Sequence, residues 1–257
     1  MTYDNVIQLW NSFAIETVAD LDTRLDSFRV LFAYNSGKIE NPEITYNDTR
    51  EMFENNRVTR FKGDPATLTE ISNQRKCYAF LLPKIIAKEP LSVDLIKAIH
   101  EITTMATYDD RRYIDLGERP GQFKKNDFVV GINEVGSLPE DVHNDITLLL
   151  AEVNDAVPFI SPAKVIKAAA YLHAGFEHIH PFADGNGRVG RTIMNYYLMI
   201  NGHPPLIVYD EDRDEYYDGL KKYDENEDLE PLHEFFMSQL IKTWAKTIER
   251  RAKSQKQ

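Results

Sequence analysis

Apolar positions recur at helical spacing along most of the chain. The clearest example follows Ser161 and Pro162, a residue suited to an N-cap and a proline suited to the first helical position. The apolar stripe behind them consists of Val165, Ala169, Leu172 and Phe176. This spacing predicts an amphipathic helix that ends near Ile179, because Pro181 disfavours helical geometry in the residue before it.

The same periodicity predicts helices along the rest of the chain. They are expected over residues 6–19, 21–34, 45–54, 69–87, 93–107, about 186–201, 213–223 and 231–248. A glycine, Gly202, lies where a C-cap glycine belongs, and residues 55–65 are polar enough for a loop. Residues 123–132 differ, since an apolar run follows a polar turn, and they predict a short β-hairpin. The expected fold class is therefore all-α, a helical bundle with one small hairpin.

Composition agrees with a folded protein of the cytoplasm. Hydrophobic residues make up 42% and charged residues 28% of the 257 residues, close to the globular average. No apolar run reaches the length of a membrane span, and the first residues lack the pattern of a signal peptide. The single cysteine, Cys77, cannot form an internal disulfide, so we expect a reducing, cytoplasmic location without membrane attachment.

Charge is strongly negative and unevenly distributed. The net charge is −11, which argues against non-specific binding of nucleic acid. Acidic residues concentrate between Tyr209 and Glu230, whereas basic residues dominate from Lys242 onward. That basic end fits a solvated helix end better than an anion-binding patch.

One loop between two predicted helices carries the residues of phosphate chemistry. Gly185 and Gly187 allow backbone N–H groups to approach a ligand closely. The next helix begins there, so its free N–H groups and positive dipole end favour an anion. Arg188 and Arg191 lie three residues apart on its first turn and can reach one polyphosphate.

The same loop offers a metal ligand and a base. Asp184 supplies a carboxylate for Mg²⁺, which takes one or two protein carboxylates together with phosphate oxygens. His180 is the nearby side chain that can accept a proton near neutral pH. Pro181 and Phe182 are expected to anchor the loop in the core.

Three other interpretations fit this loop less well. A calcium loop of the EF-hand type is excluded because Arg188 and Asn195 stand where ligands are required. Zinc binding is disfavoured because His173, His178 and His180 include no pair spaced i, i+4. An inert connection with surface arginines would explain neither the two glycines nor the two arginines.

The segment from His180 to Arg191 resembles the complete signature of the Fic (Fido) family, His-x-Phe-x-Asp/Glu-Gly-Asn-Gly-Arg-x-x-Arg. The resemblance implies an N-terminal helical region over 1–90, a Fic domain over 91–248 and a basic tail over 249–257. It also implies a Fic-type helical bundle that transfers AMP from ATP, with Mg²⁺, to a protein hydroxyl.

The resemblance implies a role for each matching position. His180 would deprotonate the target hydroxyl, and Asp184 would hold the metal between the α- and β-phosphates. Gly185, Asn186 and Gly187 would stabilise charge on the α-phosphate. Arg188 and Arg191 would face the β- and γ-phosphates.

The resemblance also concerns the hairpin and the adenosine. The hairpin would be the family's flap, which pairs with a segment of the target by β-augmentation; an ordinary edge hairpin is the alternative. The residues implied to line the nucleotide site are Val130, Gly131, Ile132, Asn133, Tyr216, Tyr217 and Asp224. Adjacent helical residues point about 100° apart, so one of the two tyrosines could serve packing alone. Where some relatives carry an asparagine, Asp224 keeps an acceptor but lacks a donor.

An N-terminal segment resembles the family's inhibitory motif, Ser/Thr-x-x-x-Glu-Gly/Asn. Ser36, Glu40 and Asn41 match its fixed positions. The resemblance implies that Glu40 pairs with Arg191 and that Ser36, one helical turn earlier, supports the same helix. A solvated glutamate at a helix end is the alternative.

The leading hypothesis is therefore an autoinhibited protein adenylyltransferase of the class with an N-terminal inhibitory helix. Its partners would be ATP and a protein substrate docked on the flap, with self-modification and a homodimer as further expectations. Two alternatives remain open, removal of AMP from a modified protein and a regulatory module that senses nucleotide.

Overall fold

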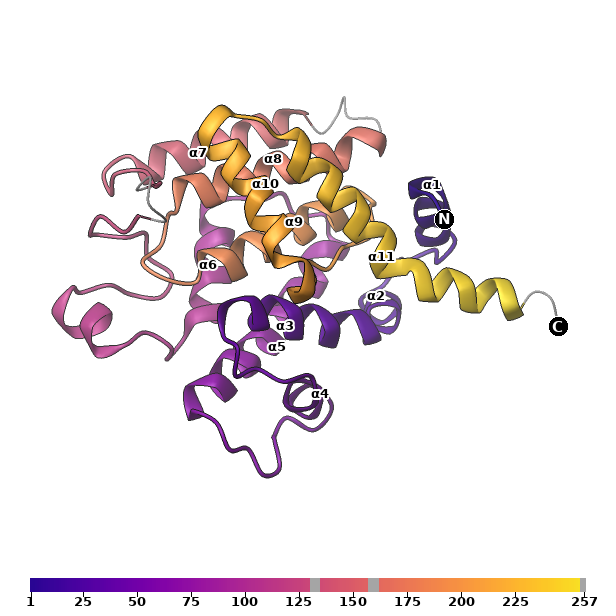
Figure 1. Cartoon of the computed structure of the whole chain (residues 1–257), viewed down its shortest axis with the longest axis horizontal. Coiled ribbons are helices and arrows are strands. Elements are labelled where there is room, and N and C mark those ends of the chain that lie inside the picture. The colour runs from indigo at the N-terminus through magenta and orange to yellow at the C-terminus, as the bar shows by residue number, and fades with distance from the viewer. Residues whose placement is uncertain (130–134, 157–161, 255–257) are drawn as a thin grey trace.

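The computed structural model describes residues 1–129, 135–156 and 162–254, and helices make up most of this part of the chain (Figure 1). The helices are α1 (Tyr3–Asn11), α2 (Val18–Arg24), α3 (Asp26–Glu40), α4 (Tyr46–Asn55), α5 (Pro65–Ile86), α6 (Val93–Thr104), the π-helical turn η1 (Arg111–Asp115), α7 (Val142–Ala156), α8 (Pro162–Ile179), α9 (Asn186–Ile200), the 3-10 turn η3 (Asp210–Asp212), α10 (Arg213–Asn226) and α11 (Glu230–Ser254). Within the described ranges the chain forms no β-strand longer than a single bridge residue, so the predicted all-α class is confirmed.

Two of the predicted helices are interrupted in the structure, and two others extend beyond their predicted bounds, α5 at its start to Pro65 and α11 at its end to Ser254. In place of the helix predicted over 6–19, α1 ends at Asn11 and a separate helix, α2, begins at Val18. A capping box formed by Thr17 and Asp20 fixes the start of α2. The Thr17 hydroxyl accepts the N–H of Asp20 at 3.1 Å, while the Asp20 carboxylate accepts the N–H of Thr17 at 2.9 Å. The helix predicted over 21–34 is divided at Leu25 and then continues to Glu40. This extension places the whole inhibitory motif on α3 or directly after it.

Helix α7 has no counterpart among the helices predicted from the sequence. Its buried positions are Val142, Ile146, Leu149, Leu150 and Val153, a helical pattern that was available in the sequence. The predicted hairpin is described only in part. Residues 123–129 are irregular, and the expected tip, residues 130–134, lies outside the described residues.

At the centre of the molecule α8 packs against α9, and the loop between them carries the candidate chemistry. Phe176, Tyr196 and Tyr197 are completely buried there. Helix α11 packs against α8, α10 and α1, and its C-terminal end extends beyond the rest of the molecule (Figure 1). Gly202 follows α9 with a φ of 74°, as expected for a glycine that ends a helix.

The N-terminal helices belong to the same hydrophobic core as α8 and α9. Trp244 of α11 packs against Trp10 of α1, with ring centroids 5.4 Å apart, and stacks on Phe28 of α3 at 6.4 Å. Residues 56–64 form the loop predicted between α4 and α5. The division into 1–90, 91–248 and 249–257 stays a prediction, although α11 continues as a helix through Ser254.

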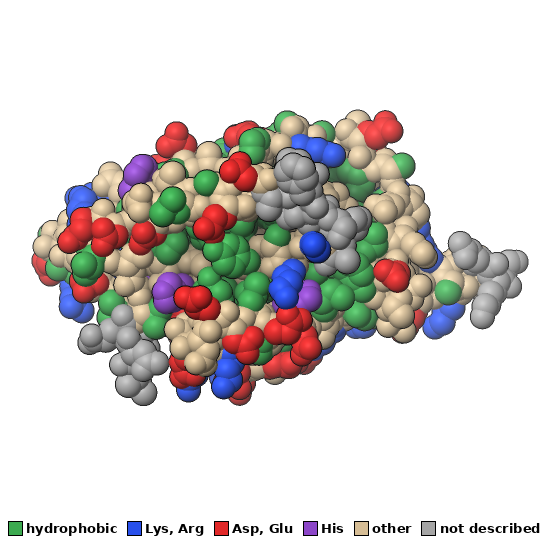
Figure 2. Space-filling view, turned by 90° about the horizontal axis from the view of Figure 1, so that it is seen from above, with side chains coloured by type: hydrophobic (Ala, Val, Ile, Leu, Met, Phe, Trp, Pro, Cys, Tyr) green, Lys and Arg blue, Asp and Glu red, His purple; other side chains and the backbone are tan. Residues whose placement is uncertain are grey.

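The surface agrees with the negative net charge. Acidic side chains spread over the face seen in Figure 2, with basic side chains among them. Of the helices in the described ranges, none combines the length and the apolar character that crossing a membrane requires.

We predict that Asn195→Ala destabilises the fold markedly. The buried Asn195 amide donates to the carbonyl of Leu206 at 2.9 Å and accepts its N–H at 2.8 Å, so the truncation leaves two backbone groups without partners. We expect a loss of about 2–4 kcal/mol in the free energy of unfolding, measured with urea. Asn201→Ala is the control, because it removes a single, half-buried hydrogen bond to the carbonyl of Tyr197. An equal loss of stability in both variants would contradict the prediction.

Candidate active site

The candidate loop runs from the end of α8 to the start of α9. His180 adopts a left-handed conformation with a φ of 49°, and its N–H donates to the carbonyl of Phe176 at 3.1 Å. At the other end, Gly185 has a φ of 80°, and a Cβ atom there would lie 2.6 Å from Cγ2 of Thr104. A glycine is therefore required at position 185 both for its backbone geometry and for its close contact with α6.

The loop is held from within by Asn186. Its side-chain amide donates to the carbonyl of Phe182 at 2.8 Å and accepts the N–H of Phe182 at 3.0 Å. The side chain is thus engaged with the loop backbone, which leaves the backbone N–H groups of Asn186, Gly187 and Arg188 as the donors at the start of α9. These N–H groups have no acceptor within the helix, and the helix dipole adds to their positive potential.

A second support is His100 on α6, which the sequence reasoning missed. Its ring stacks on Phe182 with centroids 3.7 Å apart. The N–H of Gly121 donates to Nδ1 at 2.8 Å, so Nε2 carries the proton and donates to the carbonyl of Asp184 at 3.0 Å. Burial lowers the pKa of His100 to about 3, which keeps the ring neutral. Its position among the buried residues of α6 was the available signal.

The chain before residue 130 and the chain after residue 134 are each hydrogen-bonded to the backbone next to His180. The N–H of Lys124 donates to the carbonyl of Pro181 at 2.9 Å, and the N–H of Ser137 donates to the carbonyl of Ile179 at 2.9 Å. The Lys124 ammonium is buried and donates to the carbonyl of Phe128 at 2.7 Å. The two ends of the expected flap are therefore fixed relative to His180.

His180 is neutral at ordinary pH. Burial lowers its pKa to about 4, with a further decrease from the positive charge of Lys124, while Glu40 acts in the opposite direction. A buried neutral imidazole beside an open pocket is able to accept a proton.

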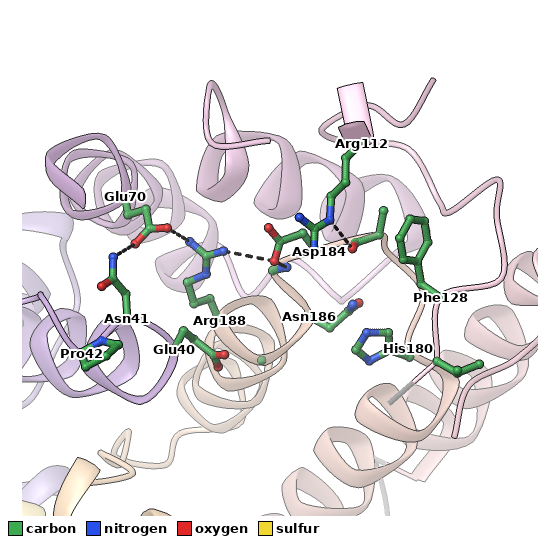
Figure 3. A pocket seen from close by; sticks show the side chains of 14 residues that line it. Glu40, Asn41, Pro42, Glu70, Arg112, Phe128, His180, Asp184, Asn186 and Arg188 are labelled. Atoms are coloured by element: carbon green, nitrogen blue, oxygen red, sulfur yellow. Dashed lines mark hydrogen bonds and ion pairs between the residues drawn. The ribbon is translucent and has the colours of Figure 1, made fainter. Parts of the chain in front are cut away.

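The pocket in front of the loop has a volume of about 490 Å³. Figure 3 shows the labelled side chains around it, with His180 and Phe128 on one side and Glu40, Asn41 and Pro42 on the other. The described residues that line it are Glu40, Asn41, Pro42, Glu70, Arg112, Phe128, Val129, His180 and the run from Ala183 to Arg188. Arg112, which the sequence reasoning missed, donates to the carbonyl of Ala183 at 3.3 Å.

Asp184 directs a partly exposed carboxylate into this pocket. One oxygen accepts the N–H of Gly185 at 2.7 Å, and the side chain keeps 34% of its surface accessible. The same oxygen lies 3.7 Å from Nη2 of Arg188. Asp184 is thus held in place while remaining open to a ligand.

Arg188 is a buried cation whose hydrogen-bonding capacity is only partly used. It lies between Asp184 and Glu70, whose Oε1 is 3.5 Å from Nη1. Its Nε and Nη1 atoms are buried and have no hydrogen-bond partner among the described residues. A buried guanidinium group with unsatisfied donors beside a pocket favours an anionic ligand.

Arg191 is held by the motif on α3, as the sequence predicted. Its Nη2 atom donates to Oε1 of Glu40 at 2.7 Å and to the carbonyl of Ser36 at 2.9 Å. Nε donates to the Ser36 hydroxyl at 3.0 Å, so Ser36 contacts the arginine directly rather than only supporting the helix. Burial acts to lower the pKa of Arg191, but Glu40, Tyr216 and Glu177 together outweigh it and raise this pKa above its ordinary value.

The residues expected around adenosine lie in different environments. Tyr216 is buried, and its hydroxyl contacts Nε2 of His173 at 2.8 Å, whereas Tyr217 is 46% exposed. Asp224 pairs with Nδ1 of His178 at 2.9 Å. The expected residues Val130, Gly131, Ile132 and Asn133 lie outside the described residues. The predicted nucleotide contacts of all these residues stay predictions.

We predict that the imidazole of His180 titrates near pH 4 and that Lys124→Met raises its pKa. Removing the ammonium removes a charge that opposes protonation, so the protonated form should then appear at higher pH. NMR titration of ¹³C-labelled histidine measures both values.

His178 is the internal control in the same spectra. Its hydrogen bond to Asp224 raises its pKa above the ordinary value, and Lys124→Met should leave that pKa unchanged. A His180 pKa near 6.5 in the unmodified chain would contradict the assignment of a buried neutral base.

Comparison with known proteins agrees with the geometry of the site. Residues 90–198 match the model of the Fic/DOC family. The chain is 30% identical over 216 residues to Protein adenylyltransferase Fic of Drosophila willistoni and 31% identical over 215 residues to that of Drosophila erecta. Each alignment covers 82% of this chain and 40% of the relative, so the chain spans about two-fifths of the length of these relatives.

Solved structures share the fold. A crystal structure of a Fic domain containing signaling protein from Bacteroides thetaiotaomicron superposes with a TM-score of 0.80 at 24% identity, covering 95% of this chain and 96% of that chain. Fic-1 from C. elegans superposes with a TM-score of 0.71 at 23% identity, covering 99% and 72%. The matched segment contains the whole loop from His180 to Arg191, and with the curated relatives it establishes that the chain contains a domain of the Fic/DOC family.

Proposed function

We propose that this chain is a protein adenylyltransferase, which transfers AMP from ATP to a Ser, Thr or Tyr hydroxyl of a target protein. The observation that carries the proposal is the neutral His180 beside a pocket that also holds Asp184, Arg188 and the N-terminus of α9. The relatives named protein adenylyltransferase support it.

In this reaction His180 is the general base. It takes the proton of the target hydroxyl as the oxygen attacks the α-phosphorus of ATP. A bond forms between the hydroxyl oxygen and the α-phosphorus, the bond from that phosphorus to the bridging oxygen breaks, and pyrophosphate leaves. Removal of the proton by a positioned base contributes typically about 10²–10⁴-fold to such reactions.

The start of α9 supplies the charge stabilisation. We propose that the backbone N–H groups of Asn186 and Gly187 face the α-phosphate, since the Asn186 side chain is engaged with Phe182. Arg188, with its unsatisfied buried donors, would face the β-phosphate, and Arg191 the γ-phosphate. Transfer of a phosphate-linked group needs mainly positioning and charge neutralisation, which these groups supply.

The residues present fit a magnesium ion that binds together with ATP. No group of three or more His, Cys, Asp or Glu side chains in the described ranges could hold a metal by itself. Mg²⁺ bound to phosphates needs only one or two protein carboxylates, and Asp184 offers one that opens into the pocket. When bound there, the ion would neutralise charge on the phosphates.

We further propose that Glu40 restrains the reaction. It occupies the Nη2 donor of Arg191 at 2.7 Å, so the γ-phosphate would enter beside a negative charge and find its arginine engaged. Ser36 stabilises the same arrangement through two contacts with Arg191. ATP bound around this pair would have its α-phosphate turned away from the attacking hydroxyl.

The proposal includes the setting in which the enzyme works. The protein substrate would dock on the flap, with self-modification and a homodimer as further features of the same proposal. A buried free Cys77 and the absence of a spanning helix in the described ranges support the cytoplasm as its location.

Removal of AMP from a modified protein is the second candidate function. It is favoured by one observation, the Glu40 carboxylate that lines the pocket beside Gly187 and Arg188. A carboxylate in that place is able to align a water molecule for attack on the phosphorus of a modified side chain.

We predict that His180→Ala lowers the rate of AMP transfer by about 10²–10⁴-fold. The affinity for ATP should stay nearly unchanged, because a base acts in the transition state. Transfer is measured by labelling protein with [α-³²P]ATP, and affinity by calorimetry. His178→Ala, which removes an exposed histidine two residues before His180, is the control. Full transfer by the His180 variant would refute the proposed mechanism.

We predict that Glu40→Gly raises labelling of target or self by about 10- to 100-fold, since productive placement of the α-phosphate is restored. Ser36→Ala should raise it more weakly. The exposed neighbouring carboxylate provides the control variant Glu43→Gly. If Glu40→Gly labels no more than the unmodified chain, Glu40 is not inhibitory; if it abolishes removal of AMP from a modified partner, the reverse reaction is the function.

A further inference from the structure

A second carboxylate, Glu70 on α5, lies beside the candidate nucleotide pocket and contacts the other arginine of the loop. Its Oε1 atom is 3.5 Å from Nη1 of Arg188, and Glu70 lines the pocket together with Arg188 (Figure 3). The Glu70 side chain is 20% exposed to solvent, and the Arg188 side chain is only 6% exposed. At such low exposure, solvent screens the attraction between the two charges incompletely.

Asn41 connects Glu70 to the inhibitory motif. Its Nδ2 atom donates to Oε2 of Glu70 at 3.1 Å and to the hydroxyl of Thr67 at 3.1 Å. Its Oδ1 atom accepts the N–H of Glu43 at 3.0 Å, which fixes the chain just beyond the end of α3. Glu40 and Asn41 are adjacent, so one end of one helix reaches Arg191 directly and Arg188 through Glu70.

The charges around the pocket show why this matters for a polyphosphate. The described lining includes three carboxylates, those of Glu40, Glu70 and Asp184, against the guanidinium groups of Arg112 and Arg188. His180 is neutral and adds no positive charge. Even with Asp184 neutralised by a metal ion, two carboxylates remain beside the cations that a phosphate chain requires.

We propose that Glu70 is a second restraining carboxylate, which opposes a phosphate at Arg188 through an ion pair at 3.5 Å, a looser contact than the hydrogen bond of Glu40 to Arg191, and that Asn41 couples the two. This inference rests on the proposed function, since it concerns the entry of ATP into the same pocket. ATP must then compete with Glu40 for Arg191 and bind Arg188 beside the negative charge of Glu70. A counter-ion needed only to keep Arg188 in place would have the opposite effect, because its loss would weaken ATP binding.

The test measures ATP affinity in the full chain by calorimetry with Mg²⁺. His180→Ala prevents turnover and Glu40→Gly removes the first restraint, and both are present in every sample. Into this parent we introduce Glu70→Gln, which keeps the size of the side chain and its bond to Asn41 but removes the charge. We expect ATP to bind about three- to tenfold more tightly. The gain should shrink as ionic strength rises from about 0.05 to 0.5 M, since the charge effect is screened.

Three matched variants separate charge from structure. Glu70→Asp restores the charge and should return the affinity toward the parent value. Glu43→Gln removes an exposed carboxylate outside the pocket and should leave the affinity unchanged. Asn41→Ala should tighten binding in the same direction as Glu70→Gln, but by less.

Each outcome has a definite meaning. Unchanged or weaker binding in Glu70→Gln overturns the restraining role of Glu70, as does an equal gain in Glu43→Gln. Tighter binding in Glu70→Gln without any in Asn41→Ala overturns the coupling through Asn41 and leaves the role of Glu70 standing. The titration measures binding and the proposed function is tested by protein labelling, so each can fail alone. Absence of ATP binding in every variant would overturn both.

Discussion

Two arginine side chains are buried on the first turns of α9, and the need to compensate their charges constrains everything around them. Arg191 is 1% exposed and Arg188 is 5% exposed. A buried cation is tolerated only where charged or polar partners surround it. For Arg191 those partners come from α3, more than 150 residues earlier in the chain, and for Arg188 from α5 and the loop itself. The position of the N-terminal helices therefore follows from the chemistry of α9 as much as from hydrophobic packing.

The loop between α8 and α9 is rigid because its backbone is bonded from several sides. Asn186 fixes Phe182, His100 fixes Asp184, and Lys124 fixes Pro181, each through a backbone group of the loop. This arrangement leaves the side chains of His180 and Asp184 free for a ligand. Preorganisation of this kind is what a site for charged transition states requires, because donors that are already oriented need no rearrangement during the reaction.

The sequence allowed the centre of the molecule to be predicted well. The helix start at Asn186 and the contact between Glu40 and Arg191 are present as expected, and the anion site that Gly185, Gly187 and the two arginines indicate stays a prediction. Local signals were sufficient there because cap residues and glycines determine local backbone geometry. The break after Asn11 also had such a signal, the capping box at Thr17, but the apolar positions continue across it.

Apart from the contact of Glu40 with Arg191, which the family resemblance implied, the sequence could not provide contacts between distant segments. His100, Arg112 and Glu70 lie at least 70 residues from the loop residues they contact, and no short motif marks them. The role of the Asn186 side chain also differs from the expectation. A polar residue in a phosphate loop suggests contact with the ligand, but the side-chain amide of Asn186 donates to the backbone carbonyl of Phe182. Tertiary packing decides which polar groups remain available, and it is not encoded in spacing alone.

The contact between Glu40 and Gly187 has a consequence for how such a restraint can be adjusted. A Cβ atom at Gly187 would lie 2.3 Å from Oε1 of Glu40, so the carboxylate occupies space that a glycine leaves open at the helix start. Glu40 thus behaves as a tethered ligand, and the docking of α3 on the core sets its effective concentration. Contacts far from the loop, such as Phe28 against Trp244, contribute to that docking. The strength of inhibition can therefore change through substitutions in the packing of α3, while every residue that contacts the substrate stays the same.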